Sequence, residues 1–342
     1  MSTELQKQFE TLLPAIEAEM RAVLHATIPT DDSFYGMIHY HMGWADEQLR
    51  PLVVKSGKNI RPVLCLLICQ AAGGNWEQAV PAAAAIEILH NFSLVHDDIE
   101  DISPTRRGRP TVWTLWGKPL AINTGDAMFA LAHLALARLA DRGVDATRVV
   151  RALRRFDETC VQLTQGQHAD MSFETRSEVG VDEYIEMITG KTAVLISLCA
   201  ELGALVAGCD DETIAHYATF GHNIGLAFQV IDDILGIWGD EALIGKSTST
   251  DITTKKKTLP VLYGLERSQS LRQLYVETEE TDEQFVAQVT ELLTENGADV
   301  FANQRAEFYS QTAVSHLEAA QPTGPGYTAL NQLVEMLLNR NH

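Results

Sequence analysis

Two pairs of neighbouring aspartates are the residues of this sequence with the clearest capacity for chemistry. Asp97-Asp98 begins the segment DDIED, which ends at Asp101, and Asp232-Asp233 begins the segment DDILG about 135 residues later. Each pair ends an apolar run with helical spacing, and a buried carboxylate is costly unless a positive group neutralises it. Asp101 is four residues after Asp97 and three residues after Asp98, so it shares a helix face with each of them. The spacing predicts a site for hard cations.

Magnesium is the cation that these carboxylates indicate. Mg²⁺ takes oxygen ligands and usually keeps waters and substrate phosphates in its coordination sphere. We expect the two acidic helix ends to face each other across a cavity and to grip a polyphosphate through the bound ions. Lysine and arginine number only 26, yet several of them form small groups, some of which follow an acidic segment by a short loop. Such groups bind phosphate oxygens, although any one of them alone would be explained as a solvated loop charge. They are Lys58, Arg61, Arg106, Arg107, Arg109, Lys191, Lys246 and Lys255–Lys257.

The bulk composition describes a chain that can bury a large core. It has 342 residues, of which 46% are hydrophobic, and no linker, repeat or low-complexity tract interrupts the apolar pattern. We therefore expect a single all-helical domain over residues 1–342, with a motif-bearing core at about 55–265. The net charge of -20 argues against a nucleic-acid-binding protein, because the sequence contains no basic stripe.

Cysteine usage and hydropathy indicate a reduced, cytoplasmic protein. The five cysteines are scattered, and Cys65 and Cys69 lie in an apolar run where free cysteine behaves as a small hydrophobe. The first twenty residues are amphipathic and charged and lack a signal-peptide core. The most membrane-like segment, residues 192–209, is interrupted by Glu201, so we expect a buried helix there and no transmembrane span.

Helical spacing dominates the whole chain, and strand signals are weak. The segment GDEALIGKSTSTDITTKKK at about 239–257 is polar and contains glycine, which predicts a functional loop. The predicted helices cover roughly 4–26, 34–54, 60–72, 77–101, 122–141, 145–170, 181–207, 211–238, 258–268, 282–297, 301–319 and 326–339.

Several motifs in fixed order give the sequence a family resemblance. HNFSLVHDDIED is followed by RRGRPT, GQHAD, KTAVL, FQVIDD, and GK with KKTLP, between about Lys55 and Val261. The chain resembles the trans-isoprenyl diphosphate synthases, of the short-chain type that includes geranylgeranyl and farnesyl diphosphate synthases. The resemblance implies an all-helical bundle around a deep central cavity, a homodimer, Mg²⁺ as the cofactor, and head-to-tail condensation of an allylic diphosphate with isopentenyl diphosphate.

The resemblance also implies a role for individual residues. Metal ions would be bound by Asp97 and Asp101 and, for a third ion, by Asp232, with Asp98, Asp233 and Asp170 in support. The allylic diphosphate would be held by Arg106, Lys191, Lys246 and Lys256. The isopentenyl diphosphate would be held by Lys58, Arg61, His90 and Arg107. Thr192 and Gln229 are further candidates for substrate binding, although packing alone would explain Gln229 equally well, as it would His90.

The length of the prenyl product is the feature that the sequence indicates least sharply. Phe92 lies five residues before Asp97, about 7.5 Å back along a helix at 1.5 Å per residue, where an aromatic ring would form a floor for the growing chain. Ser93 beside Phe92 is small, and Leu89 would be the next barrier. With no insertion in DDIED, this combination favours a C20 product over a C15 product; packing between helices is the other explanation of Phe92.

One departure from the family pattern and several rival functions stay open. Many relatives read DDxxD at the second motif, whereas Gly236 stands at its fifth position here and Asp240 is the next carboxylate.

A class I terpene cyclase handles a single diphosphate and would not need Lys58, Arg61 and Arg107. A non-catalytic partner subunit would be expected to lack one acidic motif, and both are present.

Overall fold

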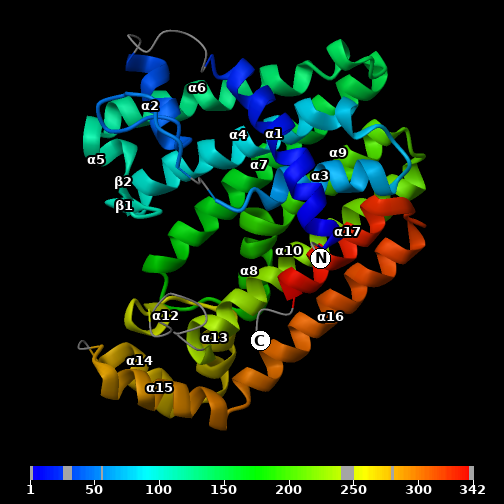
Figure 1. Ribbon diagram of the computed structural model, residues 1–342. Helices are drawn as coiled ribbons and strands as arrows, with labels where there is room; N and C mark the ends of the chain where they lie inside the picture. The colour runs from blue at the N-terminus through cyan, green and yellow to red at the C-terminus, as the bar shows by residue number, and fades with distance from the viewer. Residues whose placement is uncertain (1–2, 26–32, 55–56, 240–249, 279–280, 339–342) are drawn as a thin grey trace. The chain divides into compact units, whose positions relative to one another are not determined.

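The computed structural model describes residues 3–25, 33–54, 57–239, 250–278 and 281–338, and they are almost entirely helical (Figure 1). Within these ranges the only strands are β1 (Thr105–Arg106) and β2 (Arg109–Pro110). The predicted all-helical fold class is therefore confirmed. The chain divides into two compact units, a first unit (Met1–Arg155, Cys199–Ile214 and Pro322–Leu330) and a second unit (Phe156–Leu198, Ala215–Gln321 and Asn331–His342). The single domain over residues 1–342 stays a prediction.

The first unit is built around α4, a helix whose middle is apolar on every side. The run Ala82–Ala85 is fully buried, and these small side chains let neighbouring helices pack closely on α4, chiefly α6, α3 and α1. The helices of this unit are α1 (Glu4–Val23), α2 (Ser33–His41), α3 (Ile60–Ala71), α4 (Trp76–Glu100), α5 (Val112–Trp116), α6 (Lys118–Ala137), the 3₁₀ turn η1 (Ala140–Arg142) and the start of α7 (Ala146–Thr175).

The ends of α4 are defined by local hydrogen bonds. At its start, the side chain of Asn75 accepts a hydrogen bond from the backbone N–H of Glu77, which satisfies one of the unpaired donors of the first turn. At its end, the N–H of Asp101 donates to the carbonyl of Asp97, and the N–H of Ser103 donates to that of Asp98. The DDIED segment is thus the last turn of a buried helix, as predicted.

A short β-hairpin, which the sequence did not predict, follows this last turn. Arg106 pairs with Arg109, and the two residues between them, Arg107 and Gly108, have φ angles of 53° and 74°. Positive φ at both central positions is typical of a type I′ turn, the tight turn that matches strand twist. Strands of two residues are too short for an alternating apolar pattern to reveal them.

The predicted helix over residues 34–54 is wrong beyond His41. Gly43 has a φ of 78° and Leu49 a φ of 61°, and both angles are incompatible with a right-handed helix. The carboxylate of Asp46 accepts hydrogen bonds from the backbone N–H groups of Gln48 and Arg50, so this side chain stabilises a turn in place of a helix.

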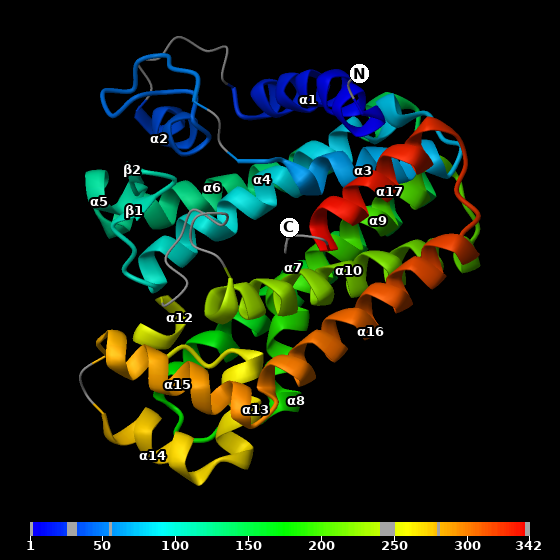
Figure 2. The ribbon, with the colours of Figure 1, turned by 60° about the horizontal axis from the view of Figure 1, so that its bottom comes forward.

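The second unit contains the remaining helices and two apolar clusters. One cluster joins α8, α10, α13 and α16 around the buried Tyr184. The other joins the end of α10 to α12–α15 around Ile237 and Ile252, and Figure 2 shows α12, α14 and α15 as neighbours. The elements are α8 (Val181–Ile188), the π turn η2 (Thr189–Ala193), α9 (Val194–Ala207), α10 (Asp211–Trp238), α12 (Thr250–Thr253), α13 (Leu259–Arg267), α14 (Gln269–Glu277), α15 (Glu283–Glu295), α16 (Ala298–Ala319) and α17 (Gly324–Leu338), of which α9, α10 and α17 also have residues in the first unit. Helix α14 was not predicted.

Two helical stretches of the described chain are long and apolar enough to cross a membrane when judged by length and composition alone. They are Lys118–Arg142 and Val181–Ala207. The apolar window of the second stretch is 72% buried inside the protein, which agrees with the buried helix predicted for residues 192–209. The window of the first stretch is 44% buried, so much of its apolar surface is exposed.

Candidate active site

The first acidic cluster occupies the end of α4 in the first unit. Asp98 is buried, while Asp97 is half-buried and Asp101 is exposed. The carboxylate of Asp98 accepts a hydrogen bond from Nε of Arg106 and forms an ion pair with Nη2 of the same guanidinium, each nitrogen lying 2.8 Å from Oδ1. Burial raises the pKa of Asp98, whereas Arg106 opposes this shift. The guanidinium of Arg106 therefore holds Asp98, and the faces carrying Asp97 and Asp101 are more open to solvent.

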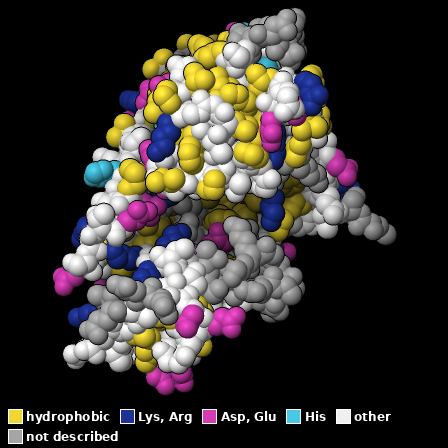
Figure 3. Space-filling view, turned by 90° about the vertical axis from the view of Figure 1, so that its left-hand side faces the viewer, with side chains coloured by type: hydrophobic (Ala, Val, Ile, Leu, Met, Phe, Trp, Pro, Cys, Tyr) yellow, Lys and Arg dark blue, Asp and Glu magenta, His cyan; other side chains and the backbone are white. Residues whose placement is uncertain are grey.

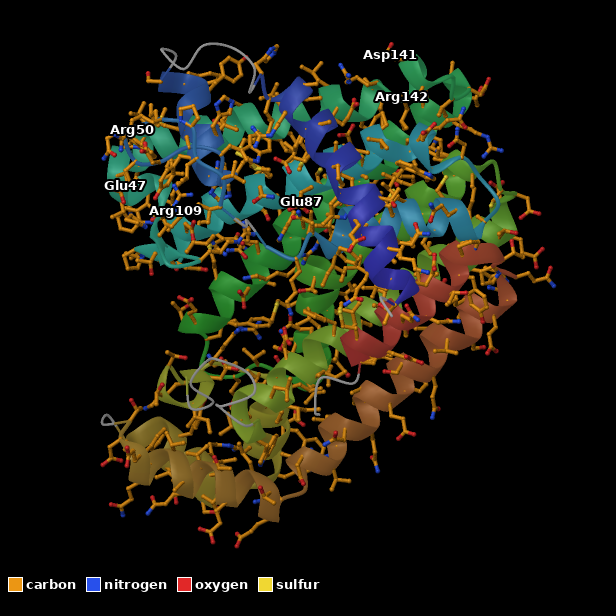
Figure 4. The ribbon with its side chains drawn as sticks, in the orientation of Figure 1. Glu47, Arg50, Glu87, Arg109, Asp141 and Arg142 are labelled. Carbon is orange, nitrogen blue, oxygen red and sulfur yellow. The ribbon has the colours of Figure 1, made fainter. Side chains whose placement is uncertain are left out.

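The hairpin that carries Arg106 is tied to the chain after α2. The guanidinium of Arg109 donates to the backbone carbonyls of Tyr40 and Ala45, at 3.1 and 2.7 Å, and lies over the ring of Tyr40. In Figure 4, Arg109 lies near Arg50 and Glu47, at the end of the unit away from Arg142. Arg109 thus anchors the hairpin, and its neighbours Arg106 and Arg107 carry the charges that remain for chemistry.

A second group of cations gathers on the same unit. Arg61 at the start of α3 lies 3.2 Å from Nε2 of His90, measured from its Nη1. The guanidinium of Arg107 approaches the loop before α3, where a Cβ placed on Gly57 would lie 3.3 Å from Nη2. Lys58, the residue after Gly57, is exposed. The structure therefore brings together the residues predicted to hold isopentenyl diphosphate, Arg61, His90 and Arg107, with Lys58 on the adjoining loop.

Arg61 retains an unused donor in this group. Its Nε is buried and has no hydrogen-bond partner among the residues that the structure describes, although buried polar atoms are nearly always paired. An N–H that lacks a protein acceptor suits an anionic ligand, because a phosphate oxygen would supply the missing acceptor. The buried, unpaired Nε therefore agrees with the predicted role of Arg61 in holding a diphosphate.

His90 is neutral in this setting. Burial lowers its pKa well below the usual range, and the nearby Arg61 and Arg107 lower it further. Arg61 can only donate a hydrogen bond, so Nε2 of the neutral ring is the acceptor. The proton then resides on Nδ1, which leaves that nitrogen as a donor. His90 is therefore more than a packed core residue, since it orients Arg61 and keeps a donor of its own.

Residues that the sequence analysis missed lie beneath the cations. Glu87 is buried on α4, where the side chain of Asn91 donates to its Oε1 at 2.9 Å. Burial raises the pKa of Glu87, while Arg61 and Arg107 lower it. The buried carboxylate thus offsets part of the repulsion between the two arginines. A signal was present, because a glutamate within AAAAIEILHN, three residues before His90, is unusual in an apolar run.

The second acidic cluster, in the second unit, also has one buried and one more accessible aspartate. Asp233 is buried and accepts three hydrogen bonds, from the hydroxyl of Tyr184 at 2.5 Å, the backbone N–H of Leu259 at 3.2 Å and the amide of Gln229 at 3.2 Å. Burial raises its pKa to about 6, although these donors oppose the shift. Gln229 in turn accepts from Thr192. Asp232, the other member of the pair, is half-buried.

Lys191 lies in a π turn, η2, that joins α8 to α9 within the stretch predicted as one helix over residues 181–207. A π turn inserts an extra residue and is frequent at functional sites. Gly166 makes room for it, because a Cβ there would lie 2.2 Å from the backbone nitrogen of Lys191. One helical turn after Gly166, Asp170 pairs with the Lys191 ammonium. The predicted residues Lys191, Thr192, Gln229 and Asp170 are therefore assembled within this unit.

Two further predicted residues follow α10. Lys256 is exposed, and its charge contributes to lowering the pKa of Asp233, so it lies on the same side of the unit as the acidic pair. Lys246 and Asp240 lie outside the residues that the structure describes.

The residues predicted to set chain length lie on α4. The ring of Phe92 packs against Phe129 of α6 and against His96, with ring centroids 5.1 and 4.9 Å apart. Leu89 is fully buried, and the hydroxyl of Ser93 donates to the carbonyl of His90. Phe92 therefore has a packing partner on α6, and its role as a floor stays a prediction.

The donor set fits Mg²⁺. Across the described residues, no three His, Cys, Asp or Glu side chains are close enough together to form a preassembled metal site. Mg²⁺ commonly binds through one or two carboxylates together with substrate phosphates, and each unit offers aspartates that are half-buried or exposed. Asp97 and Asp101 would hold ions in the first unit, and Asp232 would hold one in the second. The contacts of Asp98 and Asp233 with protein donors suit these two residues to a supporting role beside the metal ligands.

The chain is similar to known proteins of one family along most of its length. Residues 43–293 match the family model described as polyprenyl synthetase. The chain is 40% identical to the geranylgeranyl diphosphate synthase of Mycobacterium tuberculosis, over 95% of this chain and 93% of that protein. It is 45% identical to the (2E,6E)-farnesyl diphosphate synthase of Mycobacterium bovis, over 66% of this chain and 62% of that protein. Its fold matches the crystal structure of geranylgeranyl pyrophosphate synthetase from Pyrococcus horikoshii with a TM-score of 0.87 and 30% identity over 98% of each chain.

The fold and the two acidic helix ends with their attendant cations define a class of helical enzymes that act on prenyl diphosphates. The chain belongs to the polyprenyl synthetase family and is a trans-prenyltransferase of the short-chain isoprenyl diphosphate synthase type. The resemblance found in the sequence is thereby confirmed.

Proposed function

We propose that this enzyme condenses isopentenyl diphosphate head-to-tail with dimethylallyl, geranyl and farnesyl diphosphates and releases geranylgeranyl diphosphate (C20). The observation that carries the proposal is the group formed by Arg61, His90 and Arg107 beside Lys58, with the unpaired Nε of Arg61. Such a group suits a second diphosphate, which a terpene cyclase of the same fold would not bind. The C20 product is supported by the name of the M. tuberculosis relative; a C15 product is the alternative, because another relative is a farnesyl diphosphate synthase.

The proposed roles follow from where the charges lie. When bound, three Mg²⁺ ions would act as Lewis acids on the departing diphosphate and template its geometry. Asp97, Asp101 and Asp232 would hold these ions, and Arg106, Lys191, Lys246 and Lys256 would stabilise the negative charge that develops on the leaving group. Arg61, Arg107 and Lys58 would place the alkene of isopentenyl diphosphate to meet the allylic cation. The alkene would be the nucleophile and the released diphosphate would take up the proton, so the chain needs neither a nucleophile nor a dedicated general base of its own.

The proposal includes a homodimer in the cytoplasm. Helix α6 supports the dimer, because three of its large hydrophobic side chains, Leu120, Ile122 and Leu134, are 46%, 46% and 61% exposed, and a partner could cover apolar surface of this kind. Figure 3 shows hydrophobic side chains exposed on the surface of the first unit. The cytoplasmic location is supported by the burial of most of the apolar window in Val181–Ala207.

The experiment that tests the function is a product assay. The purified chain is incubated with Mg²⁺, isopentenyl diphosphate and each allylic primer, and the products are identified by mass spectrometry. We expect C20 as the main product and loss of turnover by several orders of magnitude in Asp97→Ala and in Asp232→Ala, since several kcal/mol of leaving-group stabilisation disappear at about 1.4 kcal/mol per decade. Cyclic hydrocarbons formed from one diphosphate alone would favour the cyclase, and no turnover in the wild type would favour a partner subunit.

A further inference from the structure

The space at the fifth position of the second acidic motif is occupied by another residue's side chain. Gly236, at this position on α10, has no side chain. A Cβ placed there would lie 2.3 Å from Oδ2 of Asp251 and 3.1 Å from its Cγ. The carboxylate of Asp251 therefore lies where the side chain of a fifth-position residue would begin.

Asp251 is held at this place by its own short element. The next residue, Ile252, is fully buried in the cluster that contains Ile237 of α10, so α12 is anchored beside the end of α10. The backbone N–H of Lys256 donates to the carbonyl of Asp251 at 2.8 Å, and that of Lys255 donates to the carbonyl of Ile252 at 3.0 Å. The main chain around Asp251 is thus closed into a turn, while its carboxylate points toward α10.

The surroundings of Tyr184 show which groups share this space. Burial raises the pKa of its hydroxyl well above the usual range, Asp233 adds to the rise, and Asp170 and Asp251 contribute in the same direction. Three carboxylates of the second unit therefore lie near one phenol. Because Asp232 and Gly236 are four residues apart, they share one face of α10, and the carboxylate of Asp251 lies on that face.

We propose that Asp251 supplies the carboxylate that the second acidic motif lacks at its fifth position and that it binds the divalent cation together with Asp232. The inference rests on the proposed Mg²⁺-dependent function and goes beyond it, because it assigns a ligand role to a residue outside both acidic motifs. A glycine at position 236 is then a requirement of the site, since any larger residue would displace the Asp251 carboxylate.

The direct test measures cation binding without turnover. Mg²⁺ binding in the presence of inorganic diphosphate is followed by isothermal titration calorimetry, and Mn²⁺ binding by electron paramagnetic resonance. We expect Asp251→Asn, which keeps the shape of the side chain, to weaken cation binding about 10- to 100-fold, the range seen when groups that support a metal are removed. Asp182→Asn makes the same chemical change at an exposed position of the second unit and should bind as the wild type does.

A relocated carboxylate gives the complementary test. Gly236→Asp alone should lower the melting temperature, because its Cβ would overlap the Asp251 carboxylate. Combining it with Asp251→Ala removes the overlap and returns one carboxylate to the face, so the double variant should bind the cation more tightly than Asp251→Ala alone. Circular dichroism confirms that each variant is folded.

The outcomes separate this inference from the proposed function. Wild-type binding by Asp251→Asn, with Asp232→Asn still defective, would overturn the role of Asp251 and leave the function intact. A folded double variant that binds no better than Asp251→Ala would also contradict it. If the wild type itself bound no cation with inorganic diphosphate, the proposed function would fail first.

Discussion

Within each aspartate pair, the two residues have different surroundings. Adjacent residues on a helix point about 100° apart at 3.6 residues per turn, so a helix that buries one side chain turns the other away. Asp98 is held by Arg106, and Asp233 by Tyr184, Leu259 and Gln229. The second aspartate of each pair is therefore buried among protein donors, and the first, which is more accessible, is the better candidate to hold a cation.

The raised pKa of Asp233 makes a prediction about stability. In the folded protein Asp233 keeps its proton up to about pH 6, whereas an unfolded aspartate loses it near 3.8. The folded state thus binds more protons between these values, and this group's stabilising effect is complete below pH 3.8 and is lost as the pH rises to 6. We expect the free energy of unfolding to fall more steeply over this window in the wild type than in Asp233→Asn, by about 3 kcal/mol at most. Urea unfolding of both proteins at several pH values measures the difference, and parallel profiles would contradict it.

Arg61 should serve one substrate and not the other. Its buried Nε lacks a hydrogen-bond partner within the described part of the chain, and a charge-assisted hydrogen bond contributes about 1.5–3 kcal/mol. We expect Arg61→Gln to raise the KM for isopentenyl diphosphate about 10- to 100-fold and to leave the KM for the allylic primer nearly unchanged. Steady-state kinetics with each substrate varied in turn provide the measurement.

A matched substitution and a stability measurement keep this result interpretable. Arg154→Gln removes an exposed arginine of the same unit and should change neither KM. Because Arg61 helps to compensate the buried Glu87, the melting temperature of Arg61→Gln is recorded as well. Equal losses for both substrates would argue against two separate diphosphate sites.

At the scale of elements, the sequence predicts the long helices well and the short connections poorly. Periodic apolar residues and an acidic last turn identify α4 and α10, because both signals are local. Sequence reasoning missed the hairpin at Thr105–Pro110 and the turn at Asp46, since two-residue strands and side-chain-capped turns leave no periodic pattern. Helix α14 was missed as well.

Contacts between distant residues explain what sequence reasoning could not find in the site. Tyr184 reaches Asp233 from 49 positions away, and Asp251 fills the space at Gly236. The sequence does not single out either partner: Tyr184 follows ordinary helical spacing, and Asp251 is one of several polar residues in the segment at about 239–257 that was predicted as a functional loop. Lys58, Arg61 and Arg107 were predicted from the sequence as charges that could bind phosphate, but their assignment with His90 to isopentenyl diphosphate came only through the resemblance. The structure shows that the buried Glu87 lies near Arg61 and Arg107.

The contact between α4 and α6 gives a prediction about product length. The ring of Phe92 rests against Phe129, so removing the ring leaves a space beside α6 that nearby side chains fill only in part. We expect Phe92→Ala to lengthen the product by one or more isoprene units, with the fully buried Leu89 as the next barrier. Mass spectrometry of the products is the measurement. Phe308→Ala, at a phenylalanine that is 57% exposed on α16, is the control, and an unchanged product in a folded Phe92→Ala would place the floor elsewhere.

At the scale of the whole molecule, the exposed apolar side chains of α6 are the feature that the proposed homodimer would bury. Leu134 is 61% exposed in the single chain, and burying such a side chain contributes about 1.5–3 kcal/mol. In a two-fold dimer the same residue is buried in both copies, so one substitution acts twice.

Leu134→Glu should therefore dissociate the proposed homodimer. A glutamate placed in an apolar interface must either lose its hydration or take up a proton, and both are costly, whereas the same residue on a solvated surface of the monomer is tolerated. We expect the wild type to elute at the mass of two chains in size-exclusion chromatography with light scattering, and Leu134→Glu at the mass of one, with an unchanged circular dichroism spectrum. Val300→Glu introduces the same charge at an apolar residue of α16 that is 54% exposed and should stay dimeric. A monomeric wild type would contradict the homodimer itself, while a dimeric Leu134→Glu would move the interface away from α6.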